Sequence, residues 1–259
     1  MTKVAVNVAD IRAKPKFKSE RLTQALFNER LELLEGGEEY SLVKLPDGYE
    51  GYINNRFIAD TADDYDENYI ISSVYAAAYC LSNDRRIMTL LPFACRINAI
   101  DHDDSRLRID SPRYGPLLID KSAATPLDSL PRLNYGGIRP LFENLFKFMG
   151  VPYLWGGKSF FGFDCSGFVQ INFAYFGICL PRDTKDQIRM GIEVDRKDIR
   201  PGDLLFFKKH VGVAVSDDEY IHSSVSENGV HVNSLDARKP NYLRNRSVGL
   251  RAIRRIVED

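Results

Sequence analysis

The sequence has no long hydrophobic run, few histidines and no excess of charge of either sign. Its longest apolar stretches, such as IMTLLPFA, are far shorter than a membrane-spanning helix requires. The 259 residues carry 35 lysines and arginines against 36 aspartates and glutamates, which gives a formal net charge of -1. This balance does not favour nucleic acid or an anionic membrane surface as a partner.

The N-terminal stretch MTKVAVNVADIRAKP lacks the features of a signal peptide. It has no continuous apolar core and no small-residue cleavage site. We therefore expect a cytoplasmic location, or a periplasmic one if a signal peptide has been removed.

The four cysteines lack the C-x-x-C spacing of zinc and redox motifs. Their scattered positions are typical of reduced thiols rather than of a disulfide framework. We expect Cys80, Cys95 and Cys179 to be buried structural residues, because free cysteine behaves as a small hydrophobe. The stretch GGKS at 156–159 lacks the spacing of a phosphate-binding loop. We therefore expect no cofactor and no metal.

The first half of the chain reads as short strands separated by turns. Alternating stretches such as KVAVNV, with GG at 36–37 and PDG at 46–48, predict a small β-barrel over residues 1–62. A second strand-rich stretch over residues 68–122 is less clearly patterned, and we interpret it as another small barrel. The polar residues 61–67 and the proline-containing residues 121–132 are predicted to be linkers.

Residues 130–259 have a different texture, with helices followed by strands. The stretch IRPLFENLFKFMG has apolar residues at helical spacing and ends in Gly150, and a second helix is predicted from Cys165 to Tyr175. Four strands follow: DLLFF, HVGVAV, EYIHSS and GVHVNSL. This order favours an α+β domain in which helices pack on an antiparallel sheet.

Cys165 stands at the predicted N-terminus of the second helix rather than inside its apolar run, and there it should be partly open. A helix N-terminus and a neighbouring imidazolium both favour the thiolate, so a thiolate–imidazolium pair is expected at neutral pH. His210 and His222, on consecutive predicted strands, are the candidates for the base and its orienting partner, whereas His102 is predicted to lie on the surface. Each of these residues can also be an ordinary structural residue, and spacing alone does not decide.

Strand parity makes the histidine pairing testable. His210 and His222 share a face of an antiparallel pair only if the connecting turn has an odd number of residues. The polar stretch SDDE invites a four-residue loop, which would point His222 away from His210. We therefore predict a three- or five-residue turn or a β-bulge, with His222 within hydrogen-bond reach of the His210 ring.

Five segments in order carry a family resemblance: VPYLWGGKSFFGFDCSGFVQ, LPRDTKDQ, RPGDLLFF, HVGVAV and YIHSS. They resemble the NlpC-type papain-like cysteine peptidases of bacterial cell-wall metabolism. The resemblance implies a papain-like peptidase domain over residues 130–259. It implies Cys165 as nucleophile, His210 as general base and acid, and His222 as the orienting residue. It also implies that Tyr153 lies beside the cysteine and helps to form the oxyanion site.

The resemblance further implies a substrate-binding set around Cys165. Asp164 and Ser166 would lie near the substrate, Arg182 and Asp183 would border the pocket, and Trp155 would pack against its wall. Structural roles stay open for two of these residues. Arg182 can simply pair with an acid, and Asp164 can cap the helix.

The first 120 residues resemble two bacterial SH3-like barrels, and this domain order resembles the γ-D-glutamyl-L-diamino acid endopeptidases. The resemblance implies cleavage of short murein peptides whose N-terminal L-alanine is free, in cell-wall peptide recycling or turnover. It also implies that the first barrel closes the pocket and recognises the amine through an acid and a tyrosine. Glu29 and Tyr49 are candidates, although each can be an ordinary surface residue. Whether the diamino acid is meso-diaminopimelate or L-lysine stays open.

Two other functions are considered. A hydrolase of intact peptidoglycan would use the barrels to bind the polymer, and the lack of an export signal argues against it. A non-catalytic wall-binding protein would not need the complete cysteine and histidine set. The expected partner is therefore a murein tripeptide or a related wall peptide, with no nucleic acid and no membrane span. The sequence is compatible with a monomer.

Overall fold

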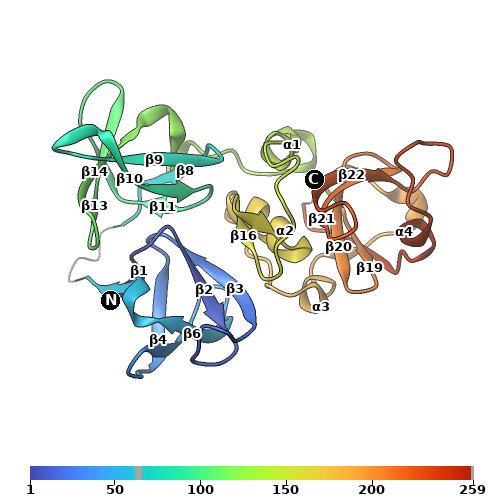
Figure 1. The fold of residues 1–259 in the computed structure, drawn as a ribbon. Coiled ribbons are helices and arrows are strands. Elements are labelled where there is room, and N and C mark those ends of the chain that lie inside the picture. The colour runs from blue at the N-terminus through green and yellow to red at the C-terminus, as the bar shows by residue number, and fades with distance from the viewer. Residues whose placement is uncertain (62–65, 258–259) are drawn as a thin grey trace. The chain divides into compact units, whose positions relative to one another are not determined.

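The computed structural model describes residues 1–61 and 66–257 of the chain, which divides into two compact units, Met1–Leu130 and Pro131–Asp259 (Figure 1). Within the described residues, no helix is long and apolar enough to cross a membrane. Each unit is described below by itself.

Seven short antiparallel strands form the first sheet of the N-terminal unit, in the order β3-β2-β6-β5-β4-β1-β7. They are β1 (Thr2–Val4), β2 (Val8–Arg12), β3 (Arg21–Leu26), β4 (Arg30–Glu35), β5 (Tyr40–Lys44), β6 (Glu50–Asn54) and β7 (Ile58–Asp60), with a 3-10 helix at Asn55–Phe57 before β7. The turn between β5 and β6 contains Gly48 at φ 82°, a conformation that glycine adopts without steric cost.

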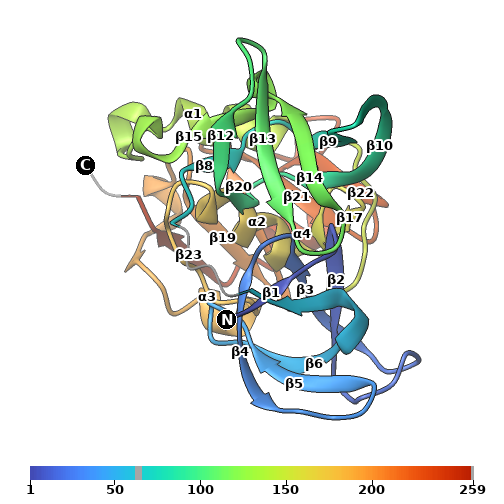
Figure 2. The same cartoon turned by 90° about the vertical axis from the view of Figure 1, so that its left-hand side faces the viewer.

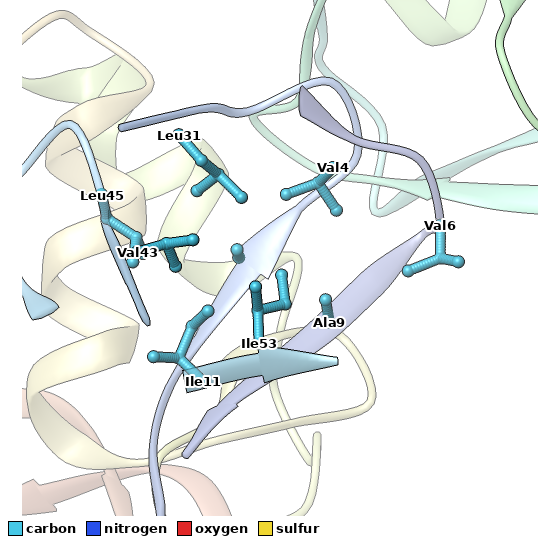
Figure 3. Packing of buried hydrophobic residues seen from close by; sticks show 9 residues of the cluster. Val4, Val6, Ala9, Ile11, Leu31, Val43, Leu45 and Ile53 are labelled. Atoms are coloured by element: carbon cyan, nitrogen blue, oxygen red, sulfur yellow. The ribbon is translucent and has the colours of Figure 1, made fainter. Parts of the chain in front are cut away.

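Alternation along these strands produces one apolar core. In β2, Ala9 and Ile11 are fully buried, while Val8, Asp10 and Arg12 are partly exposed. Figure 3 shows these side chains converging with those of the neighbouring strands. The buried cluster comprises Val4, Val6, Ala9, Ile11, Ala25, Leu31, Val43, Leu45 and Ile53.

The rest of the N-terminal unit contains two more antiparallel sheets, β10-β9-β14-β13-β12 and β11-β8-β15. In the larger one β12, β13 and β14 lie side by side (Figure 2). The strands are β8 (Tyr69–Ile71), β9 (Tyr75–Cys80), β10 (Asn83–Pro92), β11 (Arg96–Ile97), β12 (Ala99–Asp101), β13 (Arg106–Ser111), β14 (Gly115–Asp120) and β15 (Ala124–Pro126). Two 3-10 helices, Lys121–Ala123 and Leu127–Ser129, flank β15.

The two predicted linkers have different outcomes. Residues 121–132 are not simply a linker, because β15 pairs with β8 in the register Ala124 to Ile71 and completes the small sheet. The linker predicted at 61–67 falls largely on residues 62–65, which lie outside the described residues.

The C-terminal unit has four α-helices in its described part and a six-stranded antiparallel sheet in the order β18-β23-β19-β20-β21-β22. The helices are α1 (Arg139–Phe146), α2 (Cys165–Ala174), α3 (Thr184–Gln187) and α4 (Arg244–Val248). The strands of the sheet are β18 (Ile192–Glu193), β19 (Leu204–Phe207), β20 (His210–Ala214), β21 (Glu219–Ser224), β22 (Gly229–Ser234) and β23 (Ala252–Arg255). A small hairpin of β16 (Lys158–Ser159) and β17 (Gly162–Phe163) precedes α2, and 3-10 helices lie at Tyr135–Gly137 and Arg196–Asp198. This is the α+β, papain-like arrangement expected from the sequence.

Helix α2 lies against β20 and β21 and is the most deeply placed helix of this unit (Figure 1). Phe163 and Phe168 pack edge to face with ring centroids 5.5 Å apart, and Phe148 joins them. The helix ends near the predicted position, with Gly177 at φ 78° just beyond it. Because its apolar residues are buried all round, the N-terminal residue of α2 is held firmly against the sheet.

Candidate active site

Cys165 is the first residue of α2, as the sequence predicts, but it is buried rather than partly open. Only 8% of the residue is exposed. Its Sγ lies 3.8 Å from the Thr184 hydroxyl, and the backbone N–H groups of Val211 and Ser166 donate hydrogen bonds to it. Val211 directly follows His210 on β20, so the thiol lies at the start of the strand that carries the first histidine.

The hairpin between β20 and β21 has the predicted odd-numbered turn. Val213 opposes Ile221 and Ala214 opposes Tyr220, and the Val215 N–H donates to the Glu219 carbonyl at 2.8 Å. Residues 216–218 therefore form a three-residue turn without a bulge, and the prediction from parity is confirmed.

His210 and His222 consequently share a face and touch. His210 Nε2 and His222 Nδ1 are 2.6 Å apart, and the rings meet edge to face with centroids separated by 4.8 Å. Both residues are almost fully buried. Gly212 follows His210 by two residues on β20, and a Cβ there would approach Tyr220 Cδ2 to 2.9 Å and His222 Cβ to 3.2 Å, so the glycine allows β21 to pack closely at this point.

Burial shifts the pKa of both histidines downward. The pKa of His210 falls to about 2, because of burial first and then the nearby His222 and Arg246. The pKa of His222 falls to about 4 through burial, although its hydrogen bond to Asn233 acts in the opposite direction. Both rings are therefore neutral at pH 7, and each can hold its single proton on one defined nitrogen.

The pKa of the Cys165 thiol shifts upward, in the opposite direction to that of the histidines. Burial, and after it the Asp164 carboxylate, raises the pKa of Cys165, although the N–H groups of Val211 and Ser166 and the Thr184 hydroxyl lower it. The shifts of Cys165 and His210 both oppose the thiolate–imidazolium pair that the sequence predicts. Both directions favour a neutral thiol and a neutral imidazole in the resting site.

Tyr153 lies close enough to the thiol for the two groups to interact electrostatically. Its pKa is raised to about 12 by burial first and then by Cys165 and Asp164. The half-buried phenol therefore keeps its proton over the physiological range and can donate a hydrogen bond beside the sulfur.

Asp164 and Arg182 form a buried ion pair behind the nucleophile. Arg182 donates from Nη1 and Nη2 to the two carboxylate oxygens at 3.0 and 2.6 Å, and its Nη1 also donates to the Ser166 hydroxyl at 2.9 Å. Asp164 also accepts from the backbone N–H groups of Gly167 and Gly156, so it caps α2. Both structural roles that stayed open from the sequence are therefore present.

The other predicted substrate-binding residues lie at different depths and in different units. Trp155 is 62% exposed. Asp183 is half-exposed at the N-terminal end of α3. Glu29 and Tyr49 belong to the N-terminal unit, where Glu29 accepts from the Leu26 N–H at 2.7 Å and the Tyr49 N–H donates to the Asp47 side chain.

The remaining cysteines and His102 test further expectations. Cys95 is buried as expected, but Cys80 is only partly buried and Cys179 is exposed, so the prediction is wrong for those two. All four cysteines are free thiols, and His102 is exposed as predicted. Across residues 1–61 and 66–257, no group of three metal-ligating side chains comes together.

Two polar residues of this site were missed by sequence reasoning. Thr184 reaches the thiol from α3, and Asn233 on β22 approaches His222 Nε2 with its Oδ1 at 2.7 Å. Thr184 stands in the segment LPRDTKDQ, directly after Asp183, but nothing in that segment marks its hydroxyl as a neighbour of the thiol. Asn233 stands in the predicted strand GVHVNSL, and extending the parity argument by one hairpin would have brought it into view.

Comparison with known proteins gives consistent matches for both halves of the chain. The profile of the NlpC/P60 family matches residues 150–249, and that of the bacterial SH3 domain matches residues 7–59. A gamma-D-glutamyl-L-lysine dipeptidyl-peptidase of Bacillus subtilis is 31% identical over 229 residues, covering 82% of this chain and 75% of that protein. A Bacillus cereus protein of the same name is 27% identical, covering 76% of this chain and 62% of its own length.

The fold also matches a solved structure over nearly its whole length. A crystal structure of an NlpC/P60 family protein from Bacillus cereus superimposes with a TM-score of 0.85 and 22% identity, covering 99% of both chains. A probable endopeptidase of Escherichia coli, NlpC, is 40% identical over 107 residues, which cover 38% of this chain and 69% of that protein.

Proposed function

The chain belongs to the NlpC/P60 family of cysteine peptidases, and from that premise we propose that it cleaves the γ-D-glutamyl-L-diamino acid bond of short murein peptides. The observation that carries the proposal is a buried thiol at the N-terminus of α2, beside the strand whose first residue is a histidine paired to a second histidine. Relatives that span both units of the chain are named for a γ-D-glutamyl-L-lysine bond, which supports this substrate class.

In the proposed reaction Cys165 is the nucleophile. As its sulfur attacks the γ-carbonyl carbon of D-glutamate, His210 takes the thiol proton. The Tyr153 hydroxyl donates to the oxyanion that develops, which is supported by its proximity to the sulfur and its raised pKa. His210 then gives the proton to the leaving amine of the diamino acid, and a thioester remains on Cys165. Water, deprotonated by His210, releases the γ-carboxylate and restores the thiol.

His222 is proposed to orient the His210 ring through the 2.6 Å contact between them. Asp164 and Arg182 are proposed to act mainly by fixing the start of α2, since the carboxylate already accepts from two backbone N–H groups and the guanidinium. Ser166, Asp183 and Trp155 remain candidate substrate contacts on the basis of the family resemblance.

We further propose that the substrate must carry a free N-terminal amine. The support is the match of residues 7–59 of this chain to the bacterial SH3 domain, with Glu29 and Tyr49 as candidate contacts for the amine. A requirement for the free amine would restrict the enzyme to peptides already released from the wall. Such a substrate is in keeping with a cytoplasmic recycling role.

The test is a mass-spectrometric digest of L-Ala-γ-D-Glu-L-Lys and its meso-diaminopimelate counterpart beside the N-acetylated forms. The proposal expects release of the diamino acid from the free peptides and little release from the acetylated ones. Equal cleavage of both forms would favour a hydrolase of intact peptidoglycan. No cleavage of any form by folded protein would favour a wall-binding role.

A further inference from the structure

A continuous chain of hydrogen bonds runs from the backbone of residue 241 to the His210 ring. Asn233 Nδ2 donates to the Asn241 carbonyl at 3.1 Å, and Asn233 Oδ1 lies 2.7 Å from His222 Nε2. His222 Nδ1 in turn lies 2.6 Å from His210 Nε2. Asn233 is 5% exposed and His222 is fully buried, so water does not compete with these contacts.

Each hydrogen bond in this chain fixes the orientation of the next group or the nitrogen that carries its proton. The Asn241 carbonyl can only accept, so it holds the NH₂ group of Asn233 toward itself and leaves Oδ1 facing His222. An acceptor at that position requires the His222 proton to be on Nε2, which leaves His222 Nδ1 as an acceptor. His210 must then carry its proton on Nε2, and its Nδ1 is left with a free lone pair.

We propose that Asn233 is a positioning residue that sets the tautomer of His210 through His222, so that His210 Nδ1 is the basic nitrogen. The proposal rests on the proposed function, in which His210 takes the Cys165 proton. With both rings flipped to the other tautomer, His222 Nδ1–H would donate to His210 Nε2. His210 Nδ1 would then carry a proton and could not accept another one without first losing it.

The other neighbours of His222 among the described residues do not fix its tautomer. His231 directly opposes His222 on β22 but is half-exposed, and it lowers the pKa of His222, as does Arg246 of α4. Tyr220, on the same strand, contacts the His222 ring edge to face with centroids 4.8 Å apart. Of the contacts that the described residues make to His222 Nε2, the one from Asn233 is the hydrogen bond that selects a tautomer.

The experiment compares the intact wild-type chain with Asn233→Leu, Asn233→Asp and His231→Gln. The imidazole nitrogens are observed by two-bond ¹H–¹⁵N NMR at pH 7, where four histidines give a resolvable spectrum. In parallel, kcat and KM for the free tripeptide are measured across pH. His231→Gln is the matched control, because it alters the neighbour of His222 without touching the hydrogen-bond chain.

The proposal expects His210 and His222 as Nε2–H tautomers in the wild type and in His231→Gln. Asn233→Leu should mix the tautomers and lower kcat by about 10- to 100-fold with little change in KM, because one buried hydrogen bond of about 1–3 kcal/mol no longer selects the productive form. Asn233→Asp keeps an acceptor, so it should keep the Nε2–H tautomers. The acidic limb of the pH profile of kcat should move to higher pH in this variant, because the introduced carboxylate favours protonated His222. Protonated His222 carries a proton on Nδ1, which forces the His210 proton from Nε2 to Nδ1.

An Nδ1–H tautomer of His210 in the wild type would overturn the proposal. A folded Asn233→Leu variant that keeps a single tautomer of each ring and a kcat within about threefold of wild type would also overturn the proposal. If the leucine variant does not fold, the wild-type and Asn233→Asp spectra decide the matter. The spectra need no substrate, so a protein that shows the expected tautomers but cleaves no peptide would contradict the proposed function and not the tautomer assignment.

Discussion

The buried pair of Asp164 and Arg182 should respond asymmetrically to substitution. In Asp164→Ala the guanidinium, whose side chain is 1% exposed, loses both carboxylate contacts, which costs about 3–5 kcal/mol. The loss of the α2 cap adds about 1 kcal/mol. In Arg182→Met the carboxylate still accepts from the N–H groups of Gly167 and Gly156, so we expect a smaller cost of about 1–3 kcal/mol.

The double variant gives the sharper expectation. Asp164→Ala with Arg182→Met leaves no buried charge, so it should be more stable than Asp164→Ala alone by about 2 kcal/mol. Stability is measured by urea unfolding at pH 7, followed by the fluorescence of Trp155, which is the only tryptophan and belongs to the C-terminal unit.

The control is Arg139→Met at the exposed pair with Glu143, which should cost less than about 0.5 kcal/mol. If the losses of unfolding free energy in Asp164→Ala and Arg182→Met simply add in the double variant, the guanidinium is not a buried charge that depends on Asp164. A larger cost for Arg182→Met than for Asp164→Ala would refute the reasoning as well.

Three further predictions follow from burial and charge. Iodoacetamide at pH 6 should label exposed Cys179 ahead of Cys165, because burial favours the neutral thiol, whereas faster labelling of Cys165 would establish a resting thiolate. Stability should fall between pH 7 and 5 by about 2 kcal/mol for each of His210 and His222, since unfolded imidazoles bind protons below about pH 6.5 and the buried rings, with lower pKa values, do not. His222→Gln should reduce that slope in calorimetry, and an unchanged slope contradicts the assignment. N-acetylation of the substrate should raise KM or lower kcat/KM by at least about tenfold if the barrel binds the amine, because a charged contact is lost, and equal kinetics would exclude this contact.

The sequence predicted those features that depend on local pattern. Cys165 at the first position of α2 follows from an apolar run preceded by a capping aspartate, and the shared face of His210 and His222 follows from the period of two along strands. The α+β order of helices and strands could also be predicted, because it too depends on local sequence pattern.

Features that depend on distant packing were not predicted. β15 looked like a linker because its partner, β8, lies about fifty residues earlier in the chain. The exposure of Cys179 and the depth of Cys165 depend on what covers them, which local pattern does not encode. Burial also decided the pKa directions of Cys165 and His210, so the expected ion pair could not be judged from residue types alone.

The central claim is that Cys165 carries hydrolysis of the γ-D-glutamyl bond. The most direct measurement is a digest of L-Ala-γ-D-Glu-L-Lys in H₂¹⁸O, analysed by mass spectrometry, with wild type and Cys165→Ala compared at equal concentration. The account predicts one heavy oxygen in the released L-Ala-D-Glu, none in the diamino acid, and a loss of rate on the order of 10³- to 10⁶-fold in the folded variant. Undiminished turnover by Cys165→Ala, or heavy oxygen in a product from another bond, would contradict it.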